Sequence, residues 1–507
     1  MFDNDDDHDH EDEESTHPRL VSDIKDYLLT HGHLLKLVRF ETPSRVPAVG
    51  VNVSCHSTSF PRKLFNHAKS LQPSMNELYV RASQDETWLY NVLKPEIESD
   101  PMGLVASLWD VWVKCREAGT VQRVACGIVR SDYMLHATDD EGGVSLKQVE
   151  MNTFSVAGAC HAEGVASMHR WLMRRRLAEM DDADTSIQPQ LGDLPFNANT
   201  ASIVASVSAA HNIYQQQYLN GRPKCIIMIV QPENFNIADE RPMEYGLFAC
   251  YRCEWRDVLT RTQLGLDREL LFQPSGSGKG KTFEVSVVYY RAGYDVEEYC
   301  EEIGGRGIRL MLELSRAIKC PDVKMHLVGM KSVQCALAAS GVLGRFLPDS
   351  RHVDEVKETF AEMHALDSSP TGLEVRRWAT NPETAINWTL KPNLEGGGHN
   401  IFGTDIPIFL SDIPEEEWHR YILMRLITPP ASTDPGMLLT SEEVYKGPVV
   451  SELGVLGFAM WRAPLQGSKP EILKNEAIGW TFKTKPEGVD EMSVVKGYGC
   501  FDCPLLT

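Results

Sequence analysis

The chain has 507 residues, of which 42% are hydrophobic, and its 50 basic and 71 acidic side chains give a net charge of −21. This length is typical of two to four domains, and no apolar run approaches the ~20 residues that cross a bilayer. The acidic balance argues against a nucleic-acid partner, because nucleic-acid phosphates need a basic face. It does not exclude a small phosphorylated ligand, which a few local lysines can hold.

The first 18 residues are low in complexity and rich in aspartate, glutamate and histidine. This composition predicts a disordered, solvated tail, with weak metal binding as the alternative. Met1 is followed by acidic residues and not by a basic region and an apolar core. A secretory signal is therefore not expected unless processing has removed it.

Twelve cysteines are scattered through the chain, which is typical of reduced thiols. Two pairs have the C-x-x-C spacing of metal and redox sites, Cys250 with Cys253 and Cys500 with Cys503. No further cysteine or histidine has matching spacing, so packed thiols are favoured over zinc or redox chemistry.

Residues 19–125 carry apolar side chains at helical spacing, which predicts a layer of helices that covers a sheet. The segments lie near 22–35, 64–71, 76–85 and 101–117. The pattern then changes to the alternation of strands in 124–135 and 144–151, joined by an acidic turn that contains glycine. We therefore expect a β-hairpin.

The second strand of this hairpin ends in polar residues, Glu150-Met151-Asn152. Glu150 and Asn152 are two residues apart, so on a strand both side chains point to one face. Two oxygen ligands in this arrangement suit Mg²⁺, which leaves its other positions to water and phosphate. The alternative is a strand end that is polar without binding a metal.

The middle of the chain alternates helices and strands. Helices are predicted in 165–182, in 199–220 and, interrupted by Gly304-Gly305, in 297–318, and a buried strand is predicted in 224–230. The segment Pro274–Thr282 resembles a phosphate-binding P-loop, but Ser275 replaces the first glycine and strand-like residues follow. A P-loop opens a helix, so we expect an ordinary hairpin loop here.

The strand predicted in 283–290 ends in Arg291 and Tyr294, which flank Gly293. An arginine and a tyrosine around a glycine suit a carboxylate and an amide. Another helix is predicted in 352–366.

Three consecutive glycines, Gly396–Gly398, follow the short buried strand 388–390. Their backbone can take positive φ and lie flat against a ligand. Lys391 and Glu395 flank them and offer a point charge for phosphate and hard oxygens for Mg²⁺. These groups are the parts needed to hold a triphosphate, and a flexible surface turn is the alternative.

Two stretches taken together resemble eukaryotic glutathione synthetase, an ATP-grasp ligase. They are the hairpin, with R-S-D-Y-M from Arg130 and Q-V-E-M-N-T-F-S from Gln148, and the glycine stretch K-P-N-L-E-G-G-G-H-N from Lys391. The resemblance runs from about residue 100 to the C-terminus. It implies an α/β ATP-grasp fold that joins γ-glutamylcysteine and glycine through an acyl phosphate, with ATP and Mg²⁺.

The resemblance also implies a domain arrangement and a setting for the protein. After the tail in 1–18, residues 19–215 would form the helical layer and the hairpin of the ATP-grasp core, and 216–330 a substrate-binding domain. Residues 331–507 would complete the core and include a lid in 364–447. The expected partners are small molecules and a second copy in a cytoplasmic homodimer, with neither nucleic acid nor membrane.

The same resemblance implies roles for individual residues. The implied Mg²⁺ ligands are Glu150, Asn152 and Glu395. The implied ATP contacts are Glu150, Lys331, Lys391, Glu395, Gly396, Gly397, Gly398, His399, Asn400, Phe402, Met424, Arg425, Ile427, Glu452, Lys485 and Glu491. The residues implied to face substrate are Arg130, Phe154, Ser155, Val156, Ala157, Asn236, Glu240, Arg291, Tyr294, Lys483, Val494 and Val495, with Arg130 as the catalytic group.

Several positions depart from the family pattern, mostly on the acceptor side. Glu240 replaces a glutamine, Ala157 a serine, and Lys483 an arginine that grips the glycine carboxylate. A lysine keeps the charge but loses the two-pronged fork. Residues 490–497 are bulkier than the small-residue loop of the family, and Arg425 replaces an acid. A ligase for a different amine, or a weakly active or non-catalytic relative, therefore stays open as an alternative.

Overall fold

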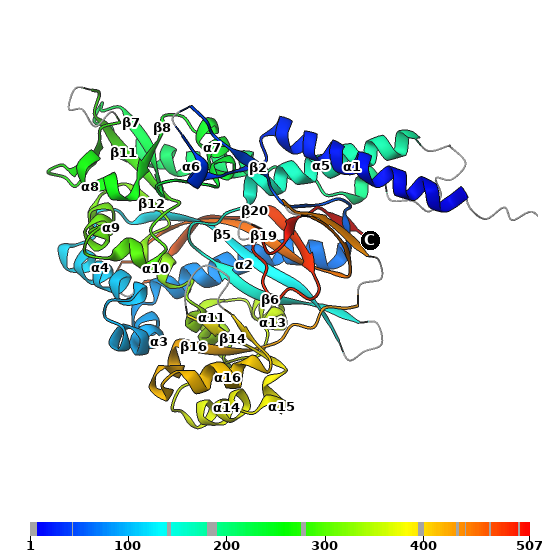
Figure 1. Ribbon diagram of the computed structural model, residues 1–507. Coiled ribbons are helices and arrows are strands. Elements are labelled where there is room, and N and C mark those ends of the chain that lie inside the picture. Colours follow the sequence, from blue (N-terminus) through cyan, green and yellow to red (C-terminus); the bar gives the residue numbers. More distant parts are fainter. Residues whose placement is uncertain are drawn as a thin grey trace, which may run out of the picture.

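The structure is a computed structural model that describes residues 8–42, 44–138, 143–179, 190–274, 280–393, 400–431, 435–441, 443–465, 468–494 and 497–507. It is a mixed α/β protein built around three sheets (Figure 1). A central sheet crosses the middle of the molecule. A second sheet, which contains β11 and is called the β11 sheet here, lies on one side of it, and a small lid sheet lies on the other.

The central sheet has eight strands in the order β18-β17-β3-β21-β20-β19-β5-β6. Its long members are β5 (Val124–Ala137), β6 (Val144–Asn152), β19 (Val449–Arg462) and β20 (Glu471–Pro486), all paired antiparallel. The short members are β3 (Val53–Ser54), β17 (Gly436–Leu439), β18 (Val444–Gly447) and β21 (Cys500–Phe501). The predicted hairpin is thus present as β5 and β6.

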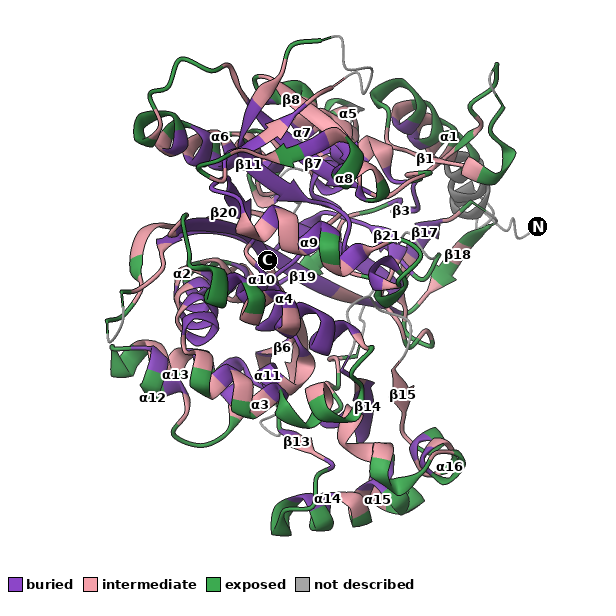
Figure 2. Ribbon diagram, turned by 90° about the vertical axis from the view of Figure 1, so that its left-hand side faces the viewer, coloured by how far each residue is buried: buried purple, intermediate pink, exposed green. Residues whose placement is uncertain are grey.

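Both faces of the central sheet are covered, so its strands are mostly buried (Figure 2). Val129 and Tyr133 of β5 join the larger core beneath α2 (Arg62–Gln84). Cys126 and Ile128 face a second core with α6 (Asn199–Gln217). Alternation along one strand therefore supplies two cores, as the two-residue period of a strand requires.

The β11 sheet has six strands, in the order β8-β7-β11-β10-β9 with β12 also paired to β11. The strands are β7 (Lys224–Val230), β8 (Cys250–Glu254), β9 (Thr262–Leu264), β10 (Leu270–Phe272), β11 (Phe283–Tyr290) and β12 (Ile318–Cys320). It lies inside the predicted segment 216–330. β10 and β11 pair antiparallel, and β11 is a strand and not a helix, as predicted; residues 275–279 of the segment between them lie outside the described residues.

The lid sheet has four strands in the order β13-β16-β14-β15. They are β13 (Met363–Ala365), β14 (Trp388–Pro392), β15 (Ile401–Phe402) and β16 (Tyr421–Arg425), packed with α14 (Pro370–Thr380), α15 (Pro382–Ala385) and α16 (Asp405–Asp412). The lid predicted in 364–447 is too long. β17 (436–439) pairs with β3 in the central sheet, where Met437 and Leu439 are buried, and β18 (444–447) pairs with β17.

Three helix predictions need correction. α1 spans His8–His31, so the helix extends through much of the tail that was predicted to be disordered, and it ends before Leu35. Its buried residues Ile24 and Leu28 pack on the core, and a helix once nucleated can propagate beyond its packed part. α2 is one helix where two were predicted. The helix predicted in 352–366 is α13 (Ser350–Thr359), and Met363–Ala365 form β13 instead. α9 (Gly305–Leu314) begins after Gly304, which has φ of 71°, at the predicted interruption.

The remaining elements complete the layers around the sheets. The helices are α3 (Glu86–Ser99), α4 (Leu104–Ala118), α5 (Ala159–Glu179), α7 (Ile237–Gly246), α8 (Val258–Arg261), α10 (Val323–Leu327), α11 (Lys331–Ala338), α12 (Leu343–Phe346) and α13 (Ser350–Thr359). The strands are β1 (Leu34–Lys36), β2 (Ala48–Gly50), β4 (Thr58–Phe60) and β22 (Pro504–Leu506).

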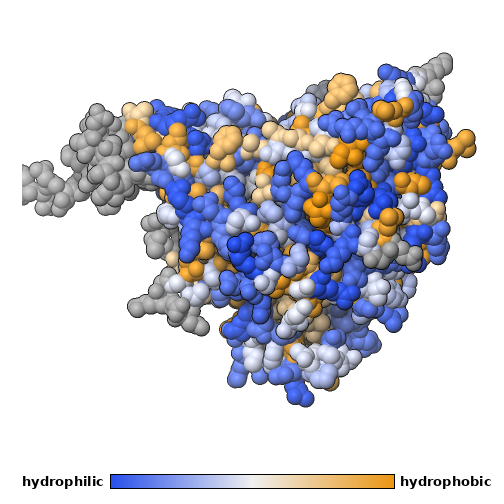
Figure 3. All heavy atoms as spheres, turned by 180° about the vertical axis from the view of Figure 1, so that it is seen from behind, coloured by the Kyte–Doolittle hydropathy of each residue, from blue (hydrophilic) through white to orange (hydrophobic). Residues whose placement is uncertain are grey.

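The outer surface is largely hydrophilic, with scattered apolar residues on the face seen in Figure 3. Among the described residues, no helix is long and apolar enough to cross a membrane. All twelve cysteines are free thiols, as predicted, and Cys253, Cys500 and Cys503 are buried.

Candidate active site

A cavity of about 420 Å³ lies between the lid sheet and the central sheet. β14 and β16 form one wall, β5, β6, β19 and β20 the other, and the segment 487–494 closes one side. This volume suits a small-molecule ligand. The residues with implied roles that line it are Arg130, Glu150, Asn152, Ala157, Lys391, Asn400, Phe402, Met424, Arg425, Ile427, Glu452, Lys483, Lys485, Glu491 and Val494.

Glu150 and Lys391 line the cavity, and Lys331 contacts Glu150 without lining the cavity itself; we call these three residues the cavity cluster. Lys331 is the first residue of α11, and its Nζ lies 3.1 Å from Glu150 Oε2. Lys391 on β14 donates to the Val149 carbonyl at 3.1 Å. Burial, reinforced by Lys331, lowers the pKa of Lys391 to about 8. Burial alone would raise the pKa of Glu150, but the two lysines and Arg130 together hold it well below its usual range.

Arg130 stands beside this cluster in a fixed orientation. Its Nε and Nη2 donate to the two carboxylate oxygens of Asp132 at 2.6 and 2.7 Å. Its Nη1 donates to the Ala157 carbonyl at 2.8 Å. Asn152 donates to Asp132 at 3.0 Å and to Glu150 at 3.1 Å. The register explains the grouping, because β5 and β6 place Arg130 opposite Asn152 and Asp132 opposite Glu150.

The donor set fits a magnesium ion with a polyphosphate. Mg²⁺ needs one or two carboxylates and leaves sites for phosphate oxygens, and Glu150 with Asn152 supplies a carboxylate and a carboxamide. The third implied ligand, Glu395, lies outside the described residues, as do Gly396, Gly397, Gly398 and His399. Among the described residues, no group of three or more histidine, cysteine, aspartate or glutamate side chains is arranged to hold a metal.

The other end of the cavity carries a buried ion pair. β19 and β20 place Glu452 opposite Lys483, and the Lys483 Nζ contacts the Glu452 carboxylate. Burial raises the pKa of Glu452, and Lys483 opposes that rise. Lys485, two residues on, donates to the carbonyls of Val489 and Asp490 and so holds the closing segment.

The lid and the closing segment meet across the cavity. The Asn400 amide, directly after the glycine stretch, donates to Glu491 Oε1 at 3.1 Å. On the lid, Met424, Arg425 and Ile427 line the cavity, and the Arg425 guanidinium lies over the Trp388 ring at 5.3 Å. The arginine is therefore held against the lid.

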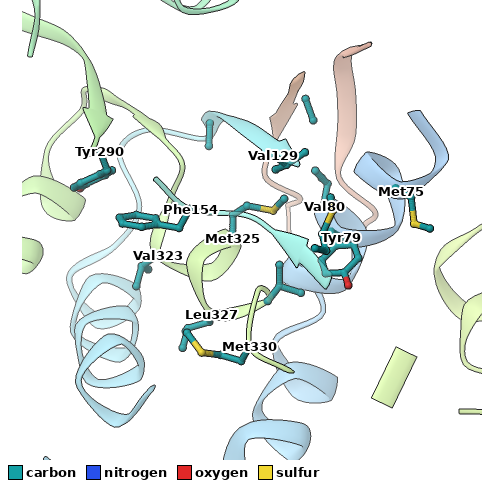
Figure 4. Packing of buried hydrophobic residues seen from close by; sticks show 14 of the residues in the cluster. Met75, Tyr79, Val80, Val129, Phe154, Tyr290, Val323, Met325, Leu327 and Met330 are labelled. Carbon is teal, nitrogen blue, oxygen red and sulfur yellow. The ribbon is translucent and has the colours of Figure 1, made fainter. Parts of the chain in front are cut away.

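Seven residues implied to face substrate do not line this cavity in the described part of the chain. They are Phe154, Ser155, Val156, Asn236, Glu240, Arg291 and Tyr294. Val495 lies outside the described residues. Phe154 is a core residue, because its ring stacks on His326 at 3.7 Å. It also lies 5.4 Å from Tyr290, and Figure 4 shows both rings among the buried residues. The ring of Phe154 therefore packs in the core, and its role in binding stays a prediction.

Arg291 is enclosed by protein partners. It contacts Asp239 at 3.2 Å and Glu240 at 3.4 Å and donates to the Val156 carbonyl. Glu240 also contacts Arg252 at 2.9 Å. We call Asp239, Glu240, Arg252 and Arg291 the buried cluster. Because the residues of the buried cluster pair with one another, the side chains of Arg291 and Glu240 do not line the cavity.

Two important carboxylates were missed by the sequence analysis. Asp132 lies two residues after Arg130 on a strand, so a shared face could have been predicted from spacing alone. Asp239 gives no such signal, because its partners are more than fifty residues away in the sequence.

Comparison with known proteins agrees with this geometry. A family model described as "Eukaryotic glutathione synthase, ATP binding domain" matches residues 14–506. The chain is 30% identical to the glutathione synthetase large chain of Schizosaccharomyces pombe, with 94% of each chain covered. It is 29% identical to glutathione synthetase of Dictyostelium discoideum, covering 96% of this chain and 99% of that one. It is 27% identical to glutathione synthetase of Homo sapiens, with 96% of each covered.

A solved structure has the same fold. It is a glutathione synthetase-like effector from Globodera pallida in its apo form, with a TM-score of 0.70, 20% identity and 96% of both chains covered. A lid sheet over a larger sheet, with lysines at one end of the enclosed cavity, defines an ATP-grasp ligase. The chain belongs to the eukaryotic glutathione synthase family. It is an ATP-dependent carbon–nitrogen ligase of the glutathione synthetase type, which uses Mg²⁺ and small-molecule substrates.

Proposed function

We propose that this ligase joins the carboxylate of γ-glutamylcysteine to the amine of glycine. The carboxylate oxygen attacks the γ-phosphorus of ATP, ADP leaves, and an acyl phosphate forms. The glycine nitrogen then attacks the acyl carbon, phosphate leaves, and the amine gives up a proton. The observation that carries the proposal is the cavity cluster, in which Glu150 and Lys391 line the cavity and Lys331 pairs with Glu150.

Phosphoryl transfer of this kind needs positioned charge and the exclusion of water more than it needs a protein nucleophile. Lys331, Lys391 and Lys485 would offer positive charge to the phosphate oxygens. Glu150 and Asn152, with Glu395, would hold Mg²⁺, which neutralises phosphate charge when bound. The lid lies over the cavity and would keep water away from the acyl phosphate.

The substrate side of the proposal rests on Arg130 and Lys483. Both line the cavity and both are cationic, so each suits a carboxylate. The relatives that match over almost the whole chain are named glutathione synthetases. A different amine acceptor and a non-catalytic protein are for this reason not favoured.

The direct test supplies ATP, Mg²⁺, γ-glutamylcysteine and glycine, measures ADP release by a coupled assay and identifies the product by mass spectrometry. We expect ADP release that requires both substrates and a tripeptide product. The variant Glu150→Gln is expected to abolish both signals. Formation of ADP without tripeptide, or a tripeptide only with another amine in place of glycine, would refute the proposed substrates.

We also propose a cytoplasmic homodimer, on the family resemblance described above. Light scattering of the purified full chain tests the oligomeric state, and a mass of one chain would contradict it. Localisation of the full-length protein by microscopy tests the compartment.

A further inference from the structure

The loop that joins β6 to α5 has an unusual backbone. Ser155 has φ of +49° and Gly158 has φ of +88°. A serine in the left-handed region is strained and persists only where its surroundings hold it. Ala157 and Gly158 line the cavity, so the shape of this loop, Phe154–Gly158, sets part of the cavity wall.

Asp239 of α7 holds the end of this loop. Its Oδ2 accepts from the Gly158 amide at 2.8 Å and its Oδ1 from the Cys160 amide at 2.9 Å. α5 begins at Ala159, so this carboxylate from another part of the chain caps the helix N-terminus. Asp239 is completely buried.

Arg291, directly after β11, holds the middle of the loop. Its Nη1 donates to the Val156 carbonyl, and its Nη2 lies 3.2 Å from Asp239 Oδ2. Its Nε lies 3.4 Å from Glu240. All three guanidinium nitrogens have protein partners and the side chain is 3% exposed, so these contacts hold Arg291 against the loop.

The loop in turn fixes the orientation of the Arg130 side chain. The Ala157 carbonyl, between the two residues held by Arg291 and Asp239, accepts from Arg130 Nη1 at 2.8 Å. The other edge of the Arg130 guanidinium is fixed by Asp132 on the same strand. A continuous set of contacts therefore runs from the β11 sheet through the loop to the cavity.

We propose that Asp239 and Arg291 are positioning residues, which fix loop 154–158 so that the Ala157 carbonyl orients the Arg130 guanidinium for the peptide substrate. The inference rests on the proposed function, because that function assigns Arg130 to the substrate carboxylate. Asp239 and Arg291 make no direct contact with Glu150, Lys331 or Lys391 in the described residues, so we expect a larger effect on the peptide substrate than on the nucleotide.

The test compares Asp239→Asn with Glu284→Gln in the full chain. Asparagine can accept one of the two amides but presents its own N–H₂ to the other, so the loop loses a partner. Glu284 is a matched control, because it is a buried carboxylate at the opposite end of β11 that pairs with Arg316 at 2.7 Å. It does not contact the loop or the cavity in the described residues.

For Asp239→Asn we expect the KM for γ-glutamylcysteine to rise at least about tenfold while the KM for ATP stays within about twofold. Backbone amides of 154–160 exchange hydrogen faster than in the unmodified protein. Glu284→Gln lowers the melting temperature but leaves both KM values and this exchange unchanged. An equal rise in both KM values, or an unchanged KM for the dipeptide, overturns the proposal.

Hydrogen exchange tests the positioning role of Asp239 and Arg291 separately from the proposed ligase function. If the unmodified protein forms no tripeptide, the proposed function fails, and exchange in 154–160 still tests the positioning device. Faster exchange in Asp239→Asn alone supports it, and equal exchange in both variants overturns it. If Asp239→Asn does not fold, Asp239→Ser, which removes the opposing N–H₂, is measured in the same way.

Discussion

The cavity cluster and the buried cluster both join acids to bases at salt-bridge distance, but they differ in exposure and in balance. In the cavity cluster Glu150 is 30% exposed and faces two lysines, so positive charge is in excess. In the buried cluster two acids meet two arginines, and the side chains are 0–13% exposed. The comparison teaches that an unbalanced cluster open to a volume can hold a ligand, whereas a balanced enclosed cluster holds the fold.

The largest expected effect comes from removing charge from the cavity cluster. Lys391→Met is expected to lower ATP turnover by about 100-fold or more, the size seen when a group that stabilises developing charge is lost. The melting temperature changes little, because the buried lysine is already costly to keep charged. Phosphate release and a thermal melt measure the two effects.

Lys147→Met is the matched control for Lys391→Met. Lys147 lies on β6 near Glu150, but its Nζ bonds the Glu358 carbonyl at 2.8 Å, away from the cavity. Turnover of this control stays near that of the unmodified protein. If both variants lose turnover to the same degree, the cavity cluster has no special role.

The second prediction concerns the buried cluster, where removing one charge should lower stability and leave nucleotide binding unchanged. Arg252→Met removes the nearer of the two arginines that pair with Glu240, at 2.9 Å against 3.4 Å for Arg291. A buried carboxylate that loses a cationic partner destabilises the fold. We expect a loss of about 2–3 kcal/mol in the free energy of unfolding, measured by urea denaturation. Binding of a non-hydrolysable ATP analogue, measured by calorimetry, stays unchanged. A loss of nucleotide affinity without a loss of stability would show that the buried cluster serves binding and does not stabilise the fold.

The third prediction concerns the Glu452–Lys483 pair, which resembles the buried cluster in balance but lines the cavity. Lys483→Arg adds the two-pronged fork that grips a carboxylate. We expect the KM for glycine to fall by about 10-fold, on the scale of 1–3 kcal/mol for one charged contact. Steady-state kinetics with varied glycine tests this, and an unchanged KM would place the glycine carboxylate elsewhere.

The smallest effect is a pH dependence of nucleotide binding. The pKa of Lys391 is about 8, so the side chain is charged below that pH and neutral above it. Nucleotide affinity therefore weakens as pH rises through 8, by up to about tenfold for each pH unit. Titration calorimetry at several pH values measures the slope. Lys391→Arg keeps its charge over this range, so a profile as steep as that of the unmodified protein would assign the slope to another group.

Local patterns predicted the part of the site that depends on strand period. The hairpin 124–151 and the shared face of Glu150 and Asn152 follow from alternation, and the structure has both. Lys391 next to the glycine stretch also follows from local order, since it ends a buried strand. These features involve residues that are close in the sequence or that lie on the two strands of one hairpin.

Features that depend on distant partners could not be predicted in this way. Arg291 looks like a ligand residue at a strand end, but Asp239 and the Val156 carbonyl enclose it. Phe154 follows the metal-binding motif, but its ring is drawn into the core by His326. The predicted lid, 364–447, extends too far toward the C-terminus. Its last part includes β17, which pairs with β3, a strand almost four hundred residues earlier in the chain.

The lid sheet has a consequence for the kinetics of release. Its own core, which includes Leu366, Trp388 and Leu423, is separate from the two cores of the central sheet. The chain enters the lid through β13 and leaves it through β16, and these strands pair, with Met363 opposite Met424. Both connections therefore cross at one place, and the lid can swing as a rigid body without exposing its interior. Opening has to break the contacts that the lid makes across the cavity, from Lys391 to the Val149 carbonyl and from Asn400 to Glu491. Where ADP departure limits turnover, the strength of these contacts therefore sets kcat.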